Sequence, residues 1–365
     1  TASQAITIDT NAPGQNGDGT APAITAITND SGTAGDFITN DQTLIFNGTA
    51  GAGDVVTVKL DGVTLGTATA NGAGVWSYDY TGTTIANGSY SLTASTTDIA
   101  GNTATATQAI TIDTNAPGQN GDGTAPAITS ISSDSGVPGD FITNVQNQIF
   151  NGTAGAGDVV TVKLDGVTLG TATANGAGVW SYDYTGTTIA NGNYTLTAST
   201  TDIAGNTATA TQAITIDTTA PTTGAGATDL NVASISTDSG VAGDFITSDN
   251  TLIINGSFNA ADTNVLTVNF NGTTYTLGTD PALTAVGNVW HLDVTGSTLA
   301  DNTYLATATA TDIAGNSSSA TQNVTVDTAL PGAPTITSIS SDSGVPGDFI
   351  TNVQNQIFNG TATAG

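Results

Sequence analysis

A ten-residue stretch rich in carboxylates occurs four times in this chain. Its pattern is Asp-Ser-Gly-x-x-Gly-Asp-Phe-Ile-Thr, with two aspartates six residues apart and glycines between them. Glycine permits tight backbone turns that do not fit a regular strand, so each copy predicts an oxygen-rich loop. Side chains of this kind could bind a hard cation. The aspartate pairs are Asp30 and Asp36, Asp134 and Asp140, Asp238 and Asp244, and Asp342 and Asp348.

Two further sets of aspartates recur with these loops. One stands in the sequence Thr-Asp-Ile-Ala-Gly-Asn, and the other follows an alternating apolar segment and precedes a threonine. Both sets survive in the most diverged part of the chain, whereas Lys163 is replaced there by Asn269. The first set is Asp98, Asp202 and Asp312, and the second is Asp9, Asp113, Asp217 and Asp327.

A repeat of domain size must position these side chains. Asp36 and Asp140 are 104 residues apart, and so are Trp76 and Trp180. This period is too long for a solenoid repeat, so each copy should fold around a core of its own. We expect domains at 22–114, 126–218 and 229–328, a last strand of a preceding repeat at 1–10, and the first strands of a further repeat at 334–365. Because the pattern is cut at both ends, we expect a segment of a longer protein.

The composition predicts an all-β chain. All thirty acidic residues are Asp, there is no Glu or Arg, and Gly, Thr and Asn are abundant. These residues favour turns and strands over helix interiors. In the first repeat, alternating segments bounded by turn signals predict about seven strands, the number in an Ig-like sandwich. The predicted strands are 24–28, 44–49, 55–60, 63–69, 75–80, 90–97 and a last strand ending at 112.

Aromatic residues mark the core of each predicted sandwich. Trp76, Trp180 and Trp290 are expected to be buried anchors. A tyrosine that starts the penultimate strand suits a tyrosine corner, in which its hydroxyl bonds to the backbone just upstream; these residues are Tyr90, Tyr194 and Tyr304. The last strand places Gln108 on the same face as apolar neighbours, so we expect a bulge or a change of sheet near it.

Strand order predicts which carboxylates meet. In an Ig-like sandwich the loop after the first strand lies near the end of the last strand, whereas the turn before the last strand lies at the opposite pole. A junction should therefore gather Asp113, the Asp30 and Asp36 loop, and Asp202 of the next repeat. In the same way, Asp98 should face the preceding linker, where Asp9 lies. Only two lysines exist to neutralise such clusters, so a cation is the natural counter-charge. All-oxygen ligation without His or Cys favours Ca²⁺, and the predicted ligands are Asp9, Asp30, Asp36, Asp98, Asp113, Asp134, Asp140, Asp202, Asp217, Asp238, Asp244, Asp312, Asp327, Asp342 and Asp348.

Other interpretations stay open at this point. The aspartates could be solvated turn formers. The linker segments Asn16–Thr20 and Asn120–Thr124 could supply an extra ion site or serve as flexible spacers. Asp41 becomes Val145 in the next copy, so it is not an obligatory ligand, and His291 is expected on a strand surface.

Several function classes are disfavoured. Almost no basic residue is present to contact nucleic acid, and no apolar run is long enough for a membrane span. Disulfides and thiol chemistry are ruled out because Cys is absent. Catalysis is not expected: two of the three domains lack histidine, there is no Gly-x-Ser-x-Gly motif, and the aspartate pairs lie in repeated loops and not in one cleft. The Thr103, Thr105 and Thr107 ladder could suggest ice binding, but solvent-facing threonines explain it more simply.

The motifs together resemble the bacterial Ig-like tandem repeats of large biofilm-associated, type I secreted (RTX-type) surface adhesins. The resemblance rests on the acidic loop, Asn47–Thr49, Gly74–Tyr78, Thr97–Asn102 and Ile112–Pro117, and it covers essentially the whole chain. It implies an extracellular, calcium-rigidified extender: a rod of sandwiches stacked end to end that projects an adhesive tip from the cell surface. The expected partners are neighbouring repeats, with homotypic or host contacts through parts outside this segment. The alternatives are a filament or surface-layer subunit and a carbohydrate-binding module.

Overall fold

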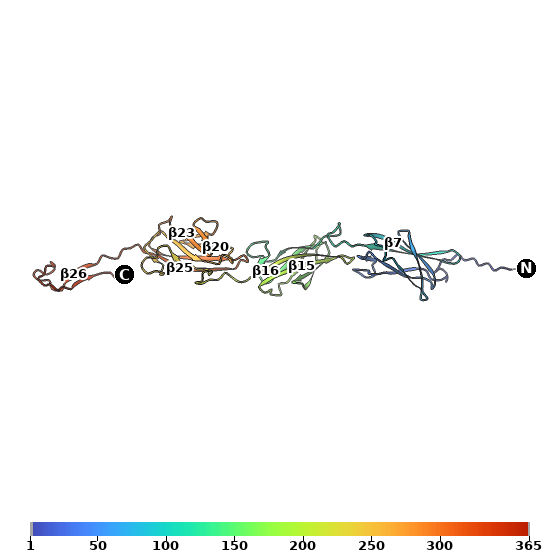
Figure 1. Cartoon of the computed structure of the whole chain (residues 1–365), viewed down its shortest axis with the longest axis horizontal. Helices are drawn as coiled ribbons and strands as arrows, with labels where there is room; N and C mark the ends of the chain where they lie inside the picture. The colour runs from blue at the N-terminus through green and yellow to red at the C-terminus, as the bar shows by residue number, and fades with distance from the viewer. Residues whose placement is uncertain (1–2, 364–365) are drawn as a thin grey trace. The chain divides into compact units, whose positions relative to one another are not determined.

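The computed structural model describes residues 3–363, and the part of the chain that it describes is built from strands without an α-helix (Figure 1). The expected fragments extend to residues 1–2 and 364–365, which lie outside the described residues. The chain divides into two compact units, Thr1–Asp217 and Thr218–Gly365. No helix within residues 3–363 is long and apolar enough to cross a bilayer.

The first repeat is a sandwich of two sheets. The larger sheet has the order β2-β8-β7-β4-β5, and the smaller sheet has the order β1-β3-β6. The five strands of the larger sheet are β2 (Ile38–Thr39), β8 (Thr103–Ile112), β7 (Gly88–Thr97), β4 (Val55–Leu60) and β5 (Val63–Thr69). The three of the smaller sheet are β1 (Ala23–Ile27), β3 (Ile45–Thr49) and β6 (Val75–Asp79).

The core of this repeat follows from alternation along the strands. Val56 and Val58 of β4 are fully buried, and Trp76 of β6 is 1% exposed, as the sequence predicts. Gly48 lies directly opposite Trp76 in the β3–β6 ladder. A methyl group at Gly48 would lie 2.3 Å from the Trp76 ring, so the indole takes the space that any larger residue needs. The hydroxyl of Tyr90 donates to the Ala86 carbonyl (2.8 Å), which confirms the tyrosine corner.

The two-residue strand β2 was not predicted. It pairs in parallel with the end of β8, with Ile38 opposite Thr111 and Thr39 opposite Ile112. The N–H of Asp113 donates to the Thr39 carbonyl at 2.9 Å. This short pairing holds the end of the acidic loop beside the end of the last strand, the proximity that the strand order predicts.

The expectation of a bulge or a change of sheet at Gln108 is wrong. Strands β7 and β8 pair without interruption from Gly88–Ile112 to Thr97–Thr103, and β8 stays in one sheet. Gln108 is only half-buried, and its side-chain amide donates to the Ala109 carbonyl at 3.0 Å. Because the side-chain amide of Gln108 is hydrogen-bonded to a neighbouring carbonyl, the strand can keep this residue on the inner face without a bulge.

The second repeat has the same architecture. Its sheets are ordered β10-β16-β15-β12-β13 and β14-β11-β9. Its strands are β9 (Ala127–Ile131), β10 (Ile142–Thr143), β11 (Ile149–Thr153), β12 (Val159–Leu164), β13 (Val167–Thr173), β14 (Val179–Asp183), β15 (Gly192–Thr201) and β16 (Thr207–Ile216). Trp180 is buried, and Tyr194 donates to the Ala190 carbonyl.

The third repeat carries an extra strand. Its sheets are ordered β18-β25-β24-β20-β21 and β17-β19-β23-β22. The chain leaves the larger sheet after a short β21, and the longer connection forms β22 beside β23, where Leu283 is buried. The strands are β17 (Ser234–Ile235), β18 (Ile246–Thr247), β19 (Ile253–Ser257), β20 (Val265–Phe270), β21 (Thr273–Thr276), β22 (Leu283–Val286), β23 (Val289–Asp293), β24 (Asn302–Thr311) and β25 (Ser317–Val326).

Three residues of the third repeat, Trp290, Tyr304 and His291, can be compared with their predicted positions. Trp290 is buried, and the hydroxyl of Tyr304 donates to the Ala300 carbonyl. His291 lies on β23, as expected, but it is half-buried and its Nδ1 lies 2.7 Å from Oδ1 of Asn255.

The flanking segments differ from the complete repeats. Residues 3–10 form no strand, although the sequence predicts a last strand there. Ile6 and Ile8 are highly exposed because no neighbouring strand packs against them. At the other end, β26 (Thr335–Ile339) and β27 (Phe358–Thr361) form a two-stranded antiparallel sheet.

Candidate metal centres in the linkers and acidic loops

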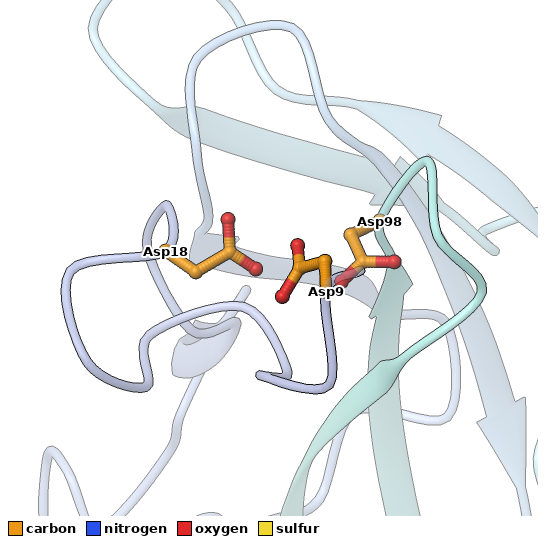
Figure 2. A group of neighbouring side chains, drawn as sticks. All are labelled: Asp9, Asp18 and Asp98. Atoms are coloured by element: carbon orange, nitrogen blue, oxygen red, sulfur yellow. The ribbon is translucent and has the colours of Figure 1, made fainter. Parts of the chain in front are cut away.

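Three carboxylates meet at the start of the first repeat. Asp9 and Asp18 come from the segment before β1, and Asp98 comes from the turn after β7. One oxygen from each lies within 4.8 Å of the others (Figure 2). This group, called the first triad, joins Asp9 and Asp98 as the strand order predicts.

The same arrangement occurs between the first and second repeats. Asp113 ends the first repeat, Asp122 lies in the linker, and Asp202 lies in the turn after β15 of the second repeat. Their oxygens also lie within 4.8 Å of one another, and they form the second triad. Asp113 and Asp202 therefore meet, as predicted, although they belong to different repeats.

An ordered turn in the linker delivers the middle carboxylate of each triad. In the first linker, the N–H of Asp18 donates to the Gln15 carbonyl at 2.8 Å, and the N–H of Gly14 donates back to the Asp18 carbonyl. Asn16 and Gly17 both have positive φ, which Asn and Gly tolerate best. The linker thus forms a defined turn that places the Asp18 carboxylate beside Asp9 and Asp98.

The linker carboxylate of each triad has a raised pKa. Partial burial raises the pKa of Asp18, and the charges of Asp9 and Asp98 raise it further. Burial together with Asp113 and Asp202 raises the pKa of Asp122 in the same way. One buried oxygen of Asp18, Oδ2, has no hydrogen-bond partner. Converging charge and an unsatisfied oxygen are the features that a bound cation would offset.

A rigid turn holds the third carboxylate. Asn102 donates to Asp98 from both its backbone N–H (2.8 Å) and its side-chain amide (2.9 Å). These bonds, the side-chain amide above all, hold the pKa of Asp98 below its ordinary value. Asn206 makes the same two bonds to Asp202. Asp98 therefore stays ionised, and the turn holds the carboxylates of both Asp98 and Asp202 in a fixed orientation.

The acidic loops form a separate type of candidate site. In Asp30, Oδ2 accepts the N–H of Gly35 (2.7 Å), whereas the buried Oδ1 has no partner. In Asp36, Oδ1 accepts the N–H of Ile38 (2.9 Å), whereas the buried Oδ2 has no partner. Neither residue belongs to a triad, so the four-carboxylate cluster expected from the sequence is divided. The same unpaired oxygens occur in Asp134 Oδ1, Asp140 Oδ2, Asp238 Oδ1 and Asp342 Oδ1.

The remaining predicted ligands lie in loops or directly after the last strand of a repeat, at the equivalent positions. Asp312 is 3% exposed and accepts two hydrogen bonds from Asn316. Asp217 follows β16, and its N–H donates to the Thr143 carbonyl. Three others each accept a nearby backbone N–H: Asp244 from Ile246, Asp327 from Ala329, and Asp348 from Ile350.

The third linker differs from the first two. It contains Asp229, whose carboxylate accepts the Thr222 hydroxyl and the Gly226 N–H. Both oxygens of Asp229 are thus used inside its own loop. Asp41, which the sequence excludes as an obligatory ligand, is likewise occupied: it accepts the side-chain amide of Asn29 and caps Thr43.

Sequence reasoning missed one acidic residue beside each triad. Asp54 lines a cavity of about 560 Å³ together with Asp9, Asp18, Asp98 and Ile99. Its charge contributes to the raised pKa of Asp18, and Asp158 acts in the same way on Asp122. The recurrence of Asp54 as Asp158 is visible in the sequence, but it does not show that these residues face a linker. The local role of Asp54, which accepts the Gly51 N–H in a turn, is all that the sequence around it indicates.

Comparisons with known proteins show what the chain is similar to. Among curated proteins, none matches it. A solved Ca²⁺-stabilised adhesin, with which an Antarctic bacterium reaches out and binds ice, shares 28% identity over 88% of this chain and 77% of that chain, with a TM-score of 0.36. A structure from a 1.5-MDa bacterial ice-binding adhesin shares 23% identity over 84% of this chain and 96% of that chain, with a TM-score of 0.34.

A third solved structure, a tetra-tandem repeat from the extending region of a large adhesion protein, shares 21% identity over 94% of this chain and 88% of that chain, with a TM-score of 0.27. The bacterial Ig-like domain model matches three times, at residues 19–114, 124–218 and 227–328. With most of its length covered by these three matches, the chain belongs to the bacterial Ig-like domain family.

Proposed function

We propose that this chain is an extender segment of a large bacterial surface adhesin, in which calcium orders the linkers and acidic loops. Its role is mechanical: it holds an adhesive part of the protein away from the cell, for attachment or biofilm formation. The chain is extracellular in this proposal, and its immediate partners are neighbouring repeats of the same polypeptide.

The observation that carries the proposal is the pair of triads. Each joins carboxylates of a linker to a carboxylate on the turn of a repeat, in a chain that has only two lysines to neutralise thirty aspartates. The donors are all oxygens, and Asp18 and Asp122 each keep a buried oxygen without a partner. A hard cation with flexible coordination fits such a donor set, and Ca²⁺ fits it better than Mg²⁺, which demands near-octahedral geometry.

Calcium would act on the linker through charge. Without a cation, three carboxylates within 4.8 Å repel one another and favour separation of the linker from the turn. A bound Ca²⁺ would reverse this preference and hold Asp122 against Asp202. The acidic loops would bind through Asp30 and Asp36, and their counterparts in the other repeats, as separate sites.

The decisive experiment compares the chain in calcium and in chelator. Small-angle scattering should give a longer maximum dimension and thermal unfolding a higher midpoint in calcium, and isothermal titration should count several ions per chain. Magnesium at the same ionic strength is the control. Equal dimensions and equal melting temperatures in calcium and chelator would refute the proposed role of calcium.

The two rival functions give different results in solution. A filament or surface-layer subunit would increase in mass with concentration during analytical ultracentrifugation, whereas an extender would remain a monomer. A carbohydrate-binding module needs an exposed aromatic platform, but Trp76, Trp180 and Trp290 are all buried. Binding of this chain to a glycan array would nevertheless support that function.

A further inference from the structure

The tip of the first acidic loop touches the second repeat directly. The Ser31 hydroxyl donates to the Ala204 carbonyl at 2.5 Å, across 173 residues of sequence. Ala204 lies in the turn Asp202–Asn206, between β15 and β16. This contact uses no carboxylate and therefore needs no ion.

The loop orients the Ser31 hydroxyl for this contact. Its oxygen accepts the backbone N–H of Asn40 at 2.8 Å. With that lone pair occupied, the hydroxyl proton is free to point at a neighbouring acceptor. The equivalent bond to the residue nine positions on exists in the later repeats, from Ser248 to Ser239 and from Asn352 to Ser343.

The neighbouring glycine fits the turn closely. Gly32 has a φ of +73°, and a methyl group on it would lie 1.9 Å from the Ile203 carbonyl oxygen. From the other side, a methyl group on Gly205 would lie 3.0 Å from the N of Gly32. Two backbones thus meet at a distance that only glycine permits, a close approach that is independent of charge.

The same turn in the first repeat provides an internal comparison. Residues 98–102 and 202–206 have the identical sequence Asp-Ile-Ala-Gly-Asn. Ala204, on which Ser31 is seated, is 0% exposed, whereas Ala100 is exposed. Ala204 is therefore buried because the loop tip covers it, and not because of the conformation of the turn.

From these contacts we infer that the Ile-Ala-Gly turn is a docking socket for the Ser-Gly tip of the adjoining copy of this repeat, and that the contact orients the two repeats without metal. The occupant is a copy of the same repeat in the same polypeptide, because in this structure Ser31 and Gly32 of the first repeat contact Ile203–Gly205 of the second. The inference does not depend on calcium binding, since none of the atoms in contact belongs to a carboxylate.

The test is a Gly32→Ala substitution in the full chain, read by distance measurements between spin labels on the first two repeats. The chain has no native cysteine, so Thr84→Cys and Thr188→Cys place labels on exposed, equivalent positions. Gly240→Ala is the matched control: Gly240 has a similar φ of +87°, but a methyl group there would meet nothing within 4 Å.

We expect Gly32→Ala to broaden the label distance distribution in calcium and in chelator, while Gly240→Ala leaves it unchanged. Ser31→Ala should act in the same direction, with Ser239→Ala as its control, and circular dichroism should show folded repeats in all variants. A Gly32→Ala distribution equal to that of Gly240→Ala would overturn the inference. The wild-type comparison between calcium and chelator tests the calcium proposal separately.

Discussion

The side-chain amide of Asn206 donates a hydrogen bond of 2.9 Å to the backbone carbonyl of Asp113, 93 residues earlier in the chain. The equivalent amide of Asn102 donates to the carbonyl of Asp9 at 3.2 Å. In both cases the same asparagine also holds the aspartate at the start of its own turn. One side chain thus connects the end of a preceding repeat to the carboxylate of a triad.

Replacing this asparagine should loosen the linker. In Asn206→Ala, the Asp113 carbonyl and one oxygen of Asp202 lose a donor, at a cost of about 1 kcal/mol for each lost bond. Hydrogen exchange of the linker amides around Asp122, measured in chelator, should accelerate. Asn102→Ala is the control, because it removes the equivalent bonds from the first repeat only. Unchanged exchange at Asp122 in Asn206→Ala would contradict this role.

Removing one carboxylate from the second triad should separate repulsion from ion binding. Asp122→Asn keeps the shape of the side chain and deletes one negative charge. In chelator we expect no loss of stability, since repulsion with Asp113 and Asp202 falls. In calcium, the stabilisation of this linker should disappear, which is about 2.7 kcal/mol for an ion at one hundred times its Kd.

The measurement for Asp122→Asn is calcium titration by calorimetry, combined with thermal unfolding. Asp165→Asn deletes the same charge from an exposed hairpin turn, where Asp165 accepts the Thr195 N–H, and should leave calcium binding intact. Equal numbers of bound ions, with equal affinities, in wild type and Asp122→Asn would exclude Asp122 as a ligand.

The glycine opposite each core tryptophan should not tolerate a side chain. In the second repeat, a methyl group on Gly152 would lie 2.0 Å from the Ala127 carbonyl and 2.3 Å from the Trp180 ring. Gly152→Ala should therefore destabilise this repeat by about 1–3 kcal/mol, as overpacking does. Gly176→Ala, which meets nothing within 4 Å, is the control. Urea unfolding followed by tryptophan fluorescence gives both values, and equal midpoints would contradict the packing argument.

Three exposed turns should make stability depend on pH. The Thr81 hydroxyl, with the Thr81 N–H, holds the pKa of Asp79 below its ordinary value, and Thr185 and Thr295 act in the same way on Asp183 and Asp293. Because these pKa values are lowered on folding, the turns contribute stability above the ordinary Asp pKa and lose it as the pH falls below about 4.

The variant that tests this effect is Asp79→Asn with Asp183→Asn and Asp293→Asn. An amide oxygen still accepts the threonine bonds but does not titrate. Between neutral pH and about pH 3, the melting temperature in chelator should fall less for the triple variant than for wild type. Identical slopes would show that these caps do not contribute to the acid sensitivity.

The general architecture was predictable because it depends on local patterns. Alternation along Val55–Leu60 and Val63–Thr69 predicted β4 and β5 to the residue. The spacing of Trp76 and Tyr90 within the repeat identified a core anchor and a tyrosine corner. Given the order of strands in a sandwich, the sequence also paired Asp9 with Asp98, and Asp113 with Asp202.

The third, diverged repeat contains a strand that local sequence patterns could not predict. The sequence shows that the third repeat is longer than the other two. It does not show where in the fold the extra residues lie. They form β22, which pairs with β23 because the chain leaves β21 early and reaches the free edge of the opposite sheet. An edge is open or closed only in the assembled sandwich, so no local pattern could predict this pairing.

The sequence by itself determined the all-β class, the repeat length, the core residues and the acidic, oxygen-only chemistry, because side-chain periodicity and residue type specify these locally. The tertiary structure alone decided that Asp18 and Asp122 turn back to complete the triads, that Asp30 and Asp36 stand apart from them, and that Gly32 lies against Ile203. The physical reason is that positive φ angles and backbone close approach set the path of a loop, and these depend on neighbours distant in sequence.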